Sequence, residues 1–255
     1  MHIKRIITHD GIFHADEVFA IALVHEFYGV IAFTRDRFVH MRELEDPTTM
    51  VLDQGGRYEP NKLNFDHHQD KHLPATVMMV LQELFNNSLM SREHYDILWS
   101  PILAISEIDI NGPEGFNGFQ VSEFIRTLNT NSGDTTKNFA IAITIARTYV
   151  RSKIEMVNTQ KPKSNLIWEK GEVIDHLIRV CEDYPMFWKD YKEQPLLVYS
   201  SAGLWKLHTA DVDDYPIKAT GKEVFLHLEL KYAHYRTKTE AIDAARKTRG
   251  MIALS

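Results

Sequence analysis

Leu63-Asn64-Phe65-Asp66-His67-His68-Gln69 is a short apolar run that ends in one acid and two histidines. The run predicts a strand over residues 63–66, with the Asp-His-His triplet at the point where the strand ends. Alone, such a triplet is more typical of a solvated turn than of a site. Four further metal-competent residues change this interpretation, because each follows a strand-like run or begins a helix: His9, His14, Asp16 and Asp53. Clusters of this kind are what divalent-metal phosphoester chemistry requires.

The segments around this stretch alternate between strand-like and helical patterns. Further strands are predicted at residues 3–7, 30–34 and 50–53. An almost wholly apolar pattern over residues 15–28 predicts a buried helix, which Gly29 is well placed to end. Strands that alternate with helices indicate an α/β fold with a mainly parallel sheet, and ligands of such sheets gather beyond the carboxyl ends of the strands. His9, Asp53 and Asp66 all lie at such ends.

The remaining predicted helices and strands divide the chain into three parts. Residues 1–158 form a metal-binding catalytic domain, with further helices at 75–85, 93–108, 119–128 and 134–157. Residues 159–184 form a helical connection, with a polar, mobile stretch at 159–165 and a weaker helix over 166–181. Residues 185–255 form a small C-terminal α+β module, with strands at 195–200, 204–209, 223–228 and 231–235 and a helix at 238–248.

Composition limits the class of protein. With 255 residues and 44% apolar content, the chain can bury a sizeable core. The net charge of −6 argues against binding nucleic acid through overall charge, although 29 Lys and Arg leave room for a local basic patch. Cys181 is the single cysteine, so an intrachain disulfide is excluded, which fits a reducing compartment. No signal peptide or membrane span is expected, and we therefore expect a cytoplasmic protein without a membrane partner.

Two segments contain the residue types of a two-metal site. His9 and His14, with Asp16 two residues later, form one of them, and Asp53 with Gly55 and Gly56 forms the other. Two divalent ions about 3.5 to 4 Å apart can activate water and clamp the oxygens of an in-line displacement at phosphorus, and they need a bridging carboxylate. The glycines would allow close approach of the backbone to the ions or to phosphate.

Four segments in this order resemble the melanocyte-proliferating-gene exonuclease family, a branch of the DHH phosphoesterase superfamily: residues 9–17, 34–36, 53–58 and 66–69. The four segments in this order identify the family far more specifically than any one segment does alone. Weaker similarity continues through residues 128–129, 187–189, 205–206 and 225–227, so that the resemblance spans nearly the whole chain.

The resemblance implies a DHH-phosphoesterase-like parallel-sheet domain with a helical segment and a smaller C-terminal α+β domain that binds substrate. It also implies paired divalent ions, Mn²⁺ or Mg²⁺, and hydrolysis of RNA or short nucleotides from an end. Carried over by position, His9 and His14 hold one ion, while Asp16, His67 and Asp109 hold the other. Asp53 bridges them, His68 contacts phosphate or protonates the leaving group, and Asp66 orients a histidine. His14 stands where many superfamily members have an aspartate, which favours Mn²⁺, Fe²⁺ or Zn²⁺ over Mg²⁺.

Two departures from the family pattern leave alternatives open. One extra residue stands between Asp109 and Gly112, so Glu107 is an alternative ligand to Asp109. In the small domain, residues 231–235 occupy the place of a glycine pair. Candidate phosphate contacts there, against the alternative of ordinary surface residues, are Lys206, His227 and Arg236. In the first domain, Arg35 and Arg57 either meet substrate phosphate or pair with the carboxylates of the pocket.

The first functional hypothesis is a metal-dependent phosphodiesterase, an exonuclease on RNA or short oligonucleotides, with Asp53 and His68 as catalytic residues. The alternatives are a small-molecule nucleotide phosphatase or dinucleotide hydrolase, which the negative net charge favours, and a non-catalytic metal-binding regulatory protein. The oligomeric state stays open, with a homodimer as one option.

Overall fold

The computed structural model describes residues 3–30, 32–115, 120–129 and 135–248. The chain divides into two compact units, residues 1–157 and 158–255, and each is described by itself. None of the described helices is both long enough and apolar enough to cross a lipid bilayer.

The first unit contains a five-stranded sheet in the order β2-β1-β3-β5-β4. Its strands are β1 (Arg5–His9), β2 (Phe33–Asp36), β3 (Thr49–Leu52), β4 (Tyr58–Glu59) and β5 (Asn64–Phe65). Strands β2, β1, β3 and β5 are parallel, and β4 pairs with β5 in the antiparallel sense. The prediction of an α/β fold with a mainly parallel sheet is therefore confirmed. Since parallel strands end at one edge, His9, Asp53 and Asp66 are brought to the same side of the sheet.

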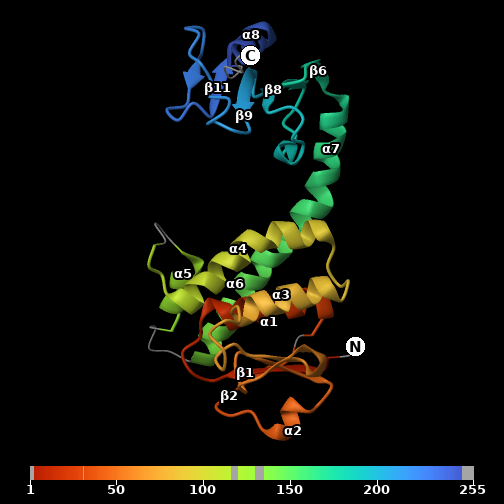
Figure 1. The fold of residues 1–255 in the computed structure, drawn as a ribbon, viewed down its shortest axis with the longest axis vertical. Coiled ribbons are helices and arrows are strands. Elements are labelled where there is room, and N and C mark those ends of the chain that lie inside the picture. Colours follow the sequence, from red (N-terminus) through yellow and green to blue (C-terminus); the bar gives the residue numbers. More distant parts are fainter. Residues whose placement is uncertain (1–2, 31, 116–119, 130–134, 249–255) are drawn as a thin grey trace. The chain divides into compact units, whose positions relative to one another are not determined.

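Helices cover this sheet in two layers (Figure 1). Helices α1 (Ala15–Tyr28) and α3 (Thr76–Asn86) lie on one face of the sheet, and α4 (Arg92–Asn111), α5 (Val121–Thr127) and α6 (Thr135–Glu155) lie beyond them. Helix α1 packs against the sheet, α3 and α6, which explains why its sequence is apolar on all sides. It ends as predicted, because Gly29 adopts a left-handed conformation (φ 71°) and donates its N–H to the carbonyl of His25. The short α2 (Met41–Leu44) packs against β3.

The second unit contains a six-stranded sheet in the order β10-β11-β9-β8-β7-β6. Its strands are β6 (Glu172–Asp175), β7 (Ile178–Cys181), β8 (Leu196–Ser201), β9 (Leu204–Thr209), β10 (Phe225–Leu226) and β11 (Tyr232–Tyr235). Only β7 and β8 are parallel among these pairs. Helix α8 (Lys238–Thr248) packs on β7, β8, β9 and β11, so this unit has the predicted α+β character.

Two predictions for the middle of the chain were wrong. The polar residues 159–165 lie within a π-helical turn (Met156–Gln160) and α7 (Lys161–Lys170), in which Pro162 occupies a tolerated position in the first turn. The helix expected over residues 166–181 ends at Lys170. The following residues form β6 and β7, an antiparallel pair in which the Asp175 carboxylate accepts the N–H of Leu177 at the turn.

Candidate metal centre

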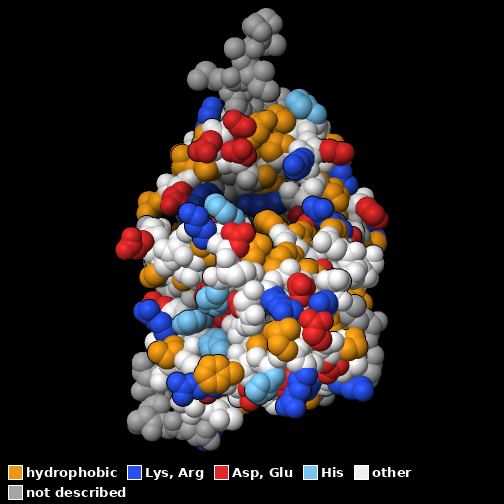
Figure 2. Space-filling model, turned by 60° about the horizontal axis from the view of Figure 1, so that its bottom comes forward, with side chains coloured by type: hydrophobic (Ala, Val, Ile, Leu, Met, Phe, Trp, Pro, Cys, Tyr) orange, Lys and Arg blue, Asp and Glu red, His pale blue; other side chains and the backbone are white. Residues whose placement is uncertain are grey.

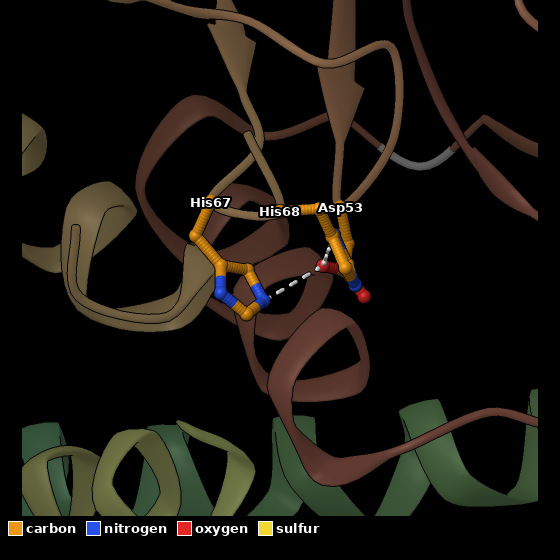
Figure 3. Close-up of side chains that lie close together, drawn as sticks. All are labelled: Asp53, His67 and His68. Atoms are coloured by element: carbon orange, nitrogen blue, oxygen red, sulfur yellow. Dashed lines mark ion pairs between the residues drawn. The ribbon is translucent and has the colours of Figure 1, made fainter. Parts of the chain in front are cut away.

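The ends of the parallel strands bring acids and histidines together in the first unit. His9 ends β1, Asp53 follows β3, and His67 and His68 follow β5. Figure 3 shows that Asp53, His67 and His68 point toward one another beyond the strand ends. Asp53 is only 5% exposed and has a left-handed backbone, with φ 57°. Such a conformation is uncommon outside glycine and often marks a functional position, although Asp tolerates it better than most residues.

One group of ligand-competent atoms centres on His9. Its Nε2 lies 3.2 Å from Glu17 Oε1 and 3.3 Å from Asp53 Oδ2. Glu17 is fully buried in the first turn of α1, where its carboxylate also accepts the N–H of His14 and closes a capping box. Together, His9, Glu17 and Asp53 offer ligand atoms that all lie within 4.8 Å of one another.

A second group centres on His67. Its Nε2 lies 3.4 Å from Asp53 Oδ1 and 3.2 Å from Asp109 Oδ2. Asp16, His67 and Asp109 again offer ligand atoms within 4.8 Å of one another. Asp109 lies in the last turn of α4, because that helix continues to Asn111 instead of ending at Ile108 as predicted. Glu107 is exposed and accepts a hydrogen bond from Asn111, so the geometry favours Asp109 as the ligand.

Asp53 lies between His9 and His67, and each of its carboxylate oxygens faces one of them. Its Oδ2 faces His9, its Oδ1 faces His67, and Asp53, His67 and His68 make a third group of ligand-competent atoms. Thr76 donates its hydroxyl toward Asp53 Oδ1 at 3.4 Å and to the carbonyl of Phe65 at 3.2 Å. Asp53 therefore offers one carboxylate oxygen to each of the two groups.

Asp66 holds His68. The carboxylate Oδ1 lies 2.7 Å from His68 Nδ1 and accepts the His68 N–H at 3.1 Å, while Oδ2 accepts the N–H of Gly56 at 2.6 Å. Asp66 is 2% exposed, whereas the His68 side chain is 63% exposed. This pairing fixes the ring through Nδ1, the arrangement that the resemblance implied for an orienting acid.

The pKa values reflect this crowding of charge. Close contacts with Asp53 and Glu17 raise the pKa of His9 to about 10, and contacts with Asp109 and Asp53 raise the pKa of His67 to about 10. Burial acts to raise the pKa of Asp53, but its close contacts with His67 and His9 outweigh that effect and lower the pKa to about 2. Burial, with the charges of Asp53 and Asp109, raises the pKa of Asp16. Without a cation, the two histidines balance the buried carboxylates by binding protons.

The donor set fits divalent metal ions. Imidazole nitrogens and carboxylate oxygens suit Mn²⁺, Fe²⁺ and Zn²⁺. His67 Nε2 is buried and, among the described residues, has no partner in hydrogen-bonding geometry although two carboxylates lie within 3.4 Å. A buried nitrogen surrounded by carboxylate oxygens without a well-formed hydrogen bond is typical of a metal ligand.

His14 lies at the edge of the cluster. Its side chain is half exposed, its ring centre lies 6.4 Å from that of His9, and its Nδ1 lies 4.0 Å from Asp109 Oδ1. It is therefore near both groups, and its pairing with His9 at one ion stays a prediction. Glu17, which lies next to His9, was not among the predicted ligands, because capping alone explains an acid at the third helical position. The burial of a carboxylate next to His9 is visible only in the fold. Exposed His14 and His68 bring imidazoles to the surface, and Figure 2 shows histidine side chains gathered on one face.

Among the described residues, neither arginine forms an ion pair with a carboxylate of the cluster. Arg35 donates to the carbonyls of His9 and Gly11, and its guanidinium lies 4.3 Å from the centre of the Phe139 ring. Arg57 pairs with Glu45 at 3.0 Å and Glu59 at 3.3 Å. Contact of either arginine with substrate phosphate stays a prediction.

The glycines after Asp53 serve the loop. Gly55 has φ 98°, and a Cβ there would lie 2.9 Å from Leu44 Cδ2 and 3.2 Å from Val39 Cγ1. Gly56 donates to Asp66. The crowding by Leu44 and Val39 explains why residue 55 is a glycine. Approach of this loop to an ion or phosphate stays a prediction.

The three candidates in the second unit lie on or beside its sheet. Lys206 Nζ lies 5.8 Å from the centre of the Tyr199 ring, the His227 ring lies 4.6 Å from that of Tyr232, and Arg236 is exposed. Their role in binding substrate stays a prediction.

Comparison with known proteins relates the chain to one family. Residues 5–86 match the model of a family described as "Uncharacterised protein family (UPF0160)". The MYG1 protein of Chlamydia muridarum is 31% identical over 204 residues, which cover 74% of this chain and 67% of that protein. The human MYG1 exonuclease is 40% identical over 68 residues, which cover 26% of this chain and 17% of that protein. A solved structure of the pGpG-specific phosphodiesterase PggH of Vibrio aligns over 97% of both chains, with a TM-score of 0.36 and 10% identity.

Proposed function

This chain belongs to the MYG1 family, and from that premise we propose that it is a metal-dependent phosphodiesterase that removes nucleotides from an end of RNA or of short oligonucleotides. A relative in this family is named as an exonuclease. The family model matches residues 5–86, the segment that contains the strand ends. The proposal extends that activity to this chain.

The position of Asp53 between two ligand groups is the observation that supports the proposal most. His9 and Glu17 lie on one side of its carboxylate, and His67 lies on the other. Two divalent ions held there would stabilise negative charge on a phosphoryl group and activate water near neutral pH. We propose Mn²⁺ as the favoured ion, because imidazole makes up a large part of the donor set.

The protein residues then have separable tasks. Asp16, Glu17, Asp53 and Asp109 supply negative charge to hold the ions, and His9 and His67 supply nitrogen ligands. His68 stands apart from them, because its Nδ1 is engaged with Asp66. Since the contact with Asp66 raises the pKa of His68, the ring carries a proton in neutral solution more often than a free histidine does. We propose that its exposed Nε2 donates that proton to the departing oxygen.

The test compares RNA labelled at its 3′ end with RNA labelled at its 5′ end, in Mn²⁺ and in EDTA. We expect stepwise shortening from one end in Mn²⁺ and none in EDTA. Asp53→Asn keeps the shape of the side chain but loses its charge, and we expect it to lower the rate at least a hundredfold. Arg92→Gln, at an exposed ion pair with Asp96, serves as the control with an unchanged rate. Cleavage in EDTA, or full activity of Asp53→Asn, would refute the proposal.

A second candidate is hydrolysis of dinucleotides or other small nucleotides only. The net charge of −6 supports it, because a chain of this charge repels long polyanions. A series from two to twenty nucleotides separates the two candidates. Activity confined to the dinucleotide supports the second, and activity that persists with length supports the first. Stoichiometric metal by elemental analysis, without hydrolysis of any member of the series, would instead indicate a metal-binding regulatory protein.

A further inference from the structure

A cavity of about 420 Å³ adjoins the metal centre within the first unit. His14, Asp16 and Asp109 form the edge that it shares with the ligand groups. The other walls come from the last turns of α4, the residues after it and α5. Its volume lies in the range of sites for single small molecules.

The α4 side of the cavity is apolar. Ile105 and Ile108 stand on successive turns of α4, and Pro113 and Ala15 continue the lining. Ile105 and Ala15 are almost completely buried, at 1% and 2% exposure, so the apolar surface open to a ligand comes from Ile108 and Pro113. Such a surface suits a flat apolar group.

The α5 side of the cavity is polar, and one of its buried polar atoms lacks a hydrogen-bond partner among the described residues. The hydroxyl oxygen of Ser122 is buried and lacks a hydrogen-bond partner among the described residues. Arg126 and Glu123 line the same side, and within the described part of the chain neither forms an ion pair. Leaving a buried hydroxyl unpaired costs about 1–3 kcal/mol, so a ligand with a polar edge would recover part of that free energy.

We propose that this cavity binds the nucleoside of the terminal nucleotide, with the base against Ile108 and Pro113 and its polar edge toward Ser122. The inference rests on the proposed function, because a phosphate at the metal centre would place the attached nucleoside at the shared edge. A nucleobase combines a flat apolar face with a polar rim, which the two sides of the cavity match. Arg126 adds positive charge beside the negatively charged ligand. Since the cavity holds a single unpaired nucleoside, we expect the protein to bind single-stranded ends in preference to duplex ends.

The test measures binding, so that it is independent of turnover. Adenosine 5′-monophosphate and ribose 5-phosphate, which lacks the base, are titrated into the full chain in Mn²⁺ buffer by calorimetry. We expect at least tenfold tighter binding of the nucleotide. Ile108→Trp fills the cavity and should lower the affinity for adenosine 5′-monophosphate to that for ribose 5-phosphate. Leu103→Trp is the matched control, because Leu103 lies on the same helix, is 36% exposed and does not line the cavity.

A second, smaller substitution keeps the test valid if Ile108→Trp does not fold. Ser122→Ala removes only the hydroxyl and should weaken nucleotide binding about twofold to tenfold, with no change for ribose 5-phosphate. Equal affinity of the wild type for the two ligands, or a preference that survives both cavity substitutions, overturns the proposal. The proposed function fails separately, if no phosphodiester is hydrolysed. A base preference that both cavity substitutions reduce would then still establish the nucleoside site.

Discussion

The Asp16 carboxylate accepts a hydrogen bond of 2.7 Å from the backbone N–H of Val77, 61 residues further along the chain. Its second oxygen accepts the N–H of Thr76 at 3.1 Å. Asp16 therefore satisfies two of the free N–H groups at the start of α3. The same side chain belongs to the group with His67 and Asp109, so it couples the position of α3 to the metal centre.

Because Asp16 both caps α3 and belongs to the ligand group, its removal should lower the stability of the fold as well as the affinity for metal. Asp16→Ala leaves two buried N–H groups unpaired and should cost about 2–4 kcal/mol in the free energy of unfolding. Urea denaturation in EDTA measures that cost without the metal. Asp109→Ala is the control, because no described backbone N–H is bonded to that side chain, and it should weaken metal binding with a smaller change in stability. Equal stability of the two variants in EDTA would contradict the helix-capping role.

A steric prediction concerns Gly55 and Gly56. Both have positive φ, so alanine at either position should cost about 1 kcal/mol through backbone strain. At Gly55 the new methyl group would also press on buried Leu44 and on Val39, and crowding of that kind should raise the total to about 2–4 kcal/mol. Nothing lies within 4 Å of a Cβ at Gly56, which makes Gly56→Ala the matched control. Equal urea midpoints of the two variants would show that the loop adapts freely.

The Asp66–His68 pair predicts a shift in the pH profile. The contact with Asp66 raises the pKa of His68, and a proton donor loses activity as the pH rises through its pKa. In Asp66→Asn that loss should begin at lower pH, while the metal requirement stays the same. The logarithm of kcat/KM against pH, from 5 to 10, measures the shift. A uniform drop at every pH, with the alkaline limb unmoved, would show that Asp66 acts only as a structural support for the Gly56 turn.

The sequence predicted those parts of the fold and site that depend on local pattern. The apolar run that ends at Gly29 gave the bounds of α1, and the turn residues after each strand placed His9, Asp53 and Asp66 at one edge. Other features depend on contacts distant in sequence. Residues 172–175 and 178–181 form strands because β7 pairs with β8 and β6 then pairs with β7, which a helical pattern with polar ends does not reveal.

The same limit applies within the site. Residues Asn111 and Gly112 look like helix breakers, yet packing continues α4 to Asn111, and this places Asp109 opposite His67. Arg35 donates to the carbonyls of His9, the last residue of β1, and of Gly11, contacts that no local pattern reveals. Residue type and order therefore predicted most of the cluster, and the tertiary fold decided which neighbours each member has.

Metal binding should release protons. In the metal-free protein the pKa values of His9 and His67 are about 10, so both rings are charged at neutral pH. An imidazole binds a metal ion only through a deprotonated nitrogen, and saturation with Mn²⁺ at pH 7.5 should therefore release about two protons. Calorimetry in two buffers of different ionisation enthalpy counts them. His9→Gln should lower the count by about one, and heats that do not depend on the buffer would contradict the assignment of these histidines as ligands.

His208, on β9 in the second unit, predicts acid sensitivity away from the metal. Burial, with the nearby charges of His234 and Lys206, lowers the pKa of His208 from 6.5 to about 4. Between these pH values the unfolded chain binds a proton that the folded chain does not, so its stabilising contribution is full above pH 6.5 and is lost as the pH falls toward 4. His208→Gln should therefore lose less thermal stability than the wild type between pH 7 and 4.5, measured by calorimetry in EDTA. His72→Gln, at an exposed histidine, should follow the wild type, and parallel losses in all three proteins would show that His208 is not the residue that responds to acid.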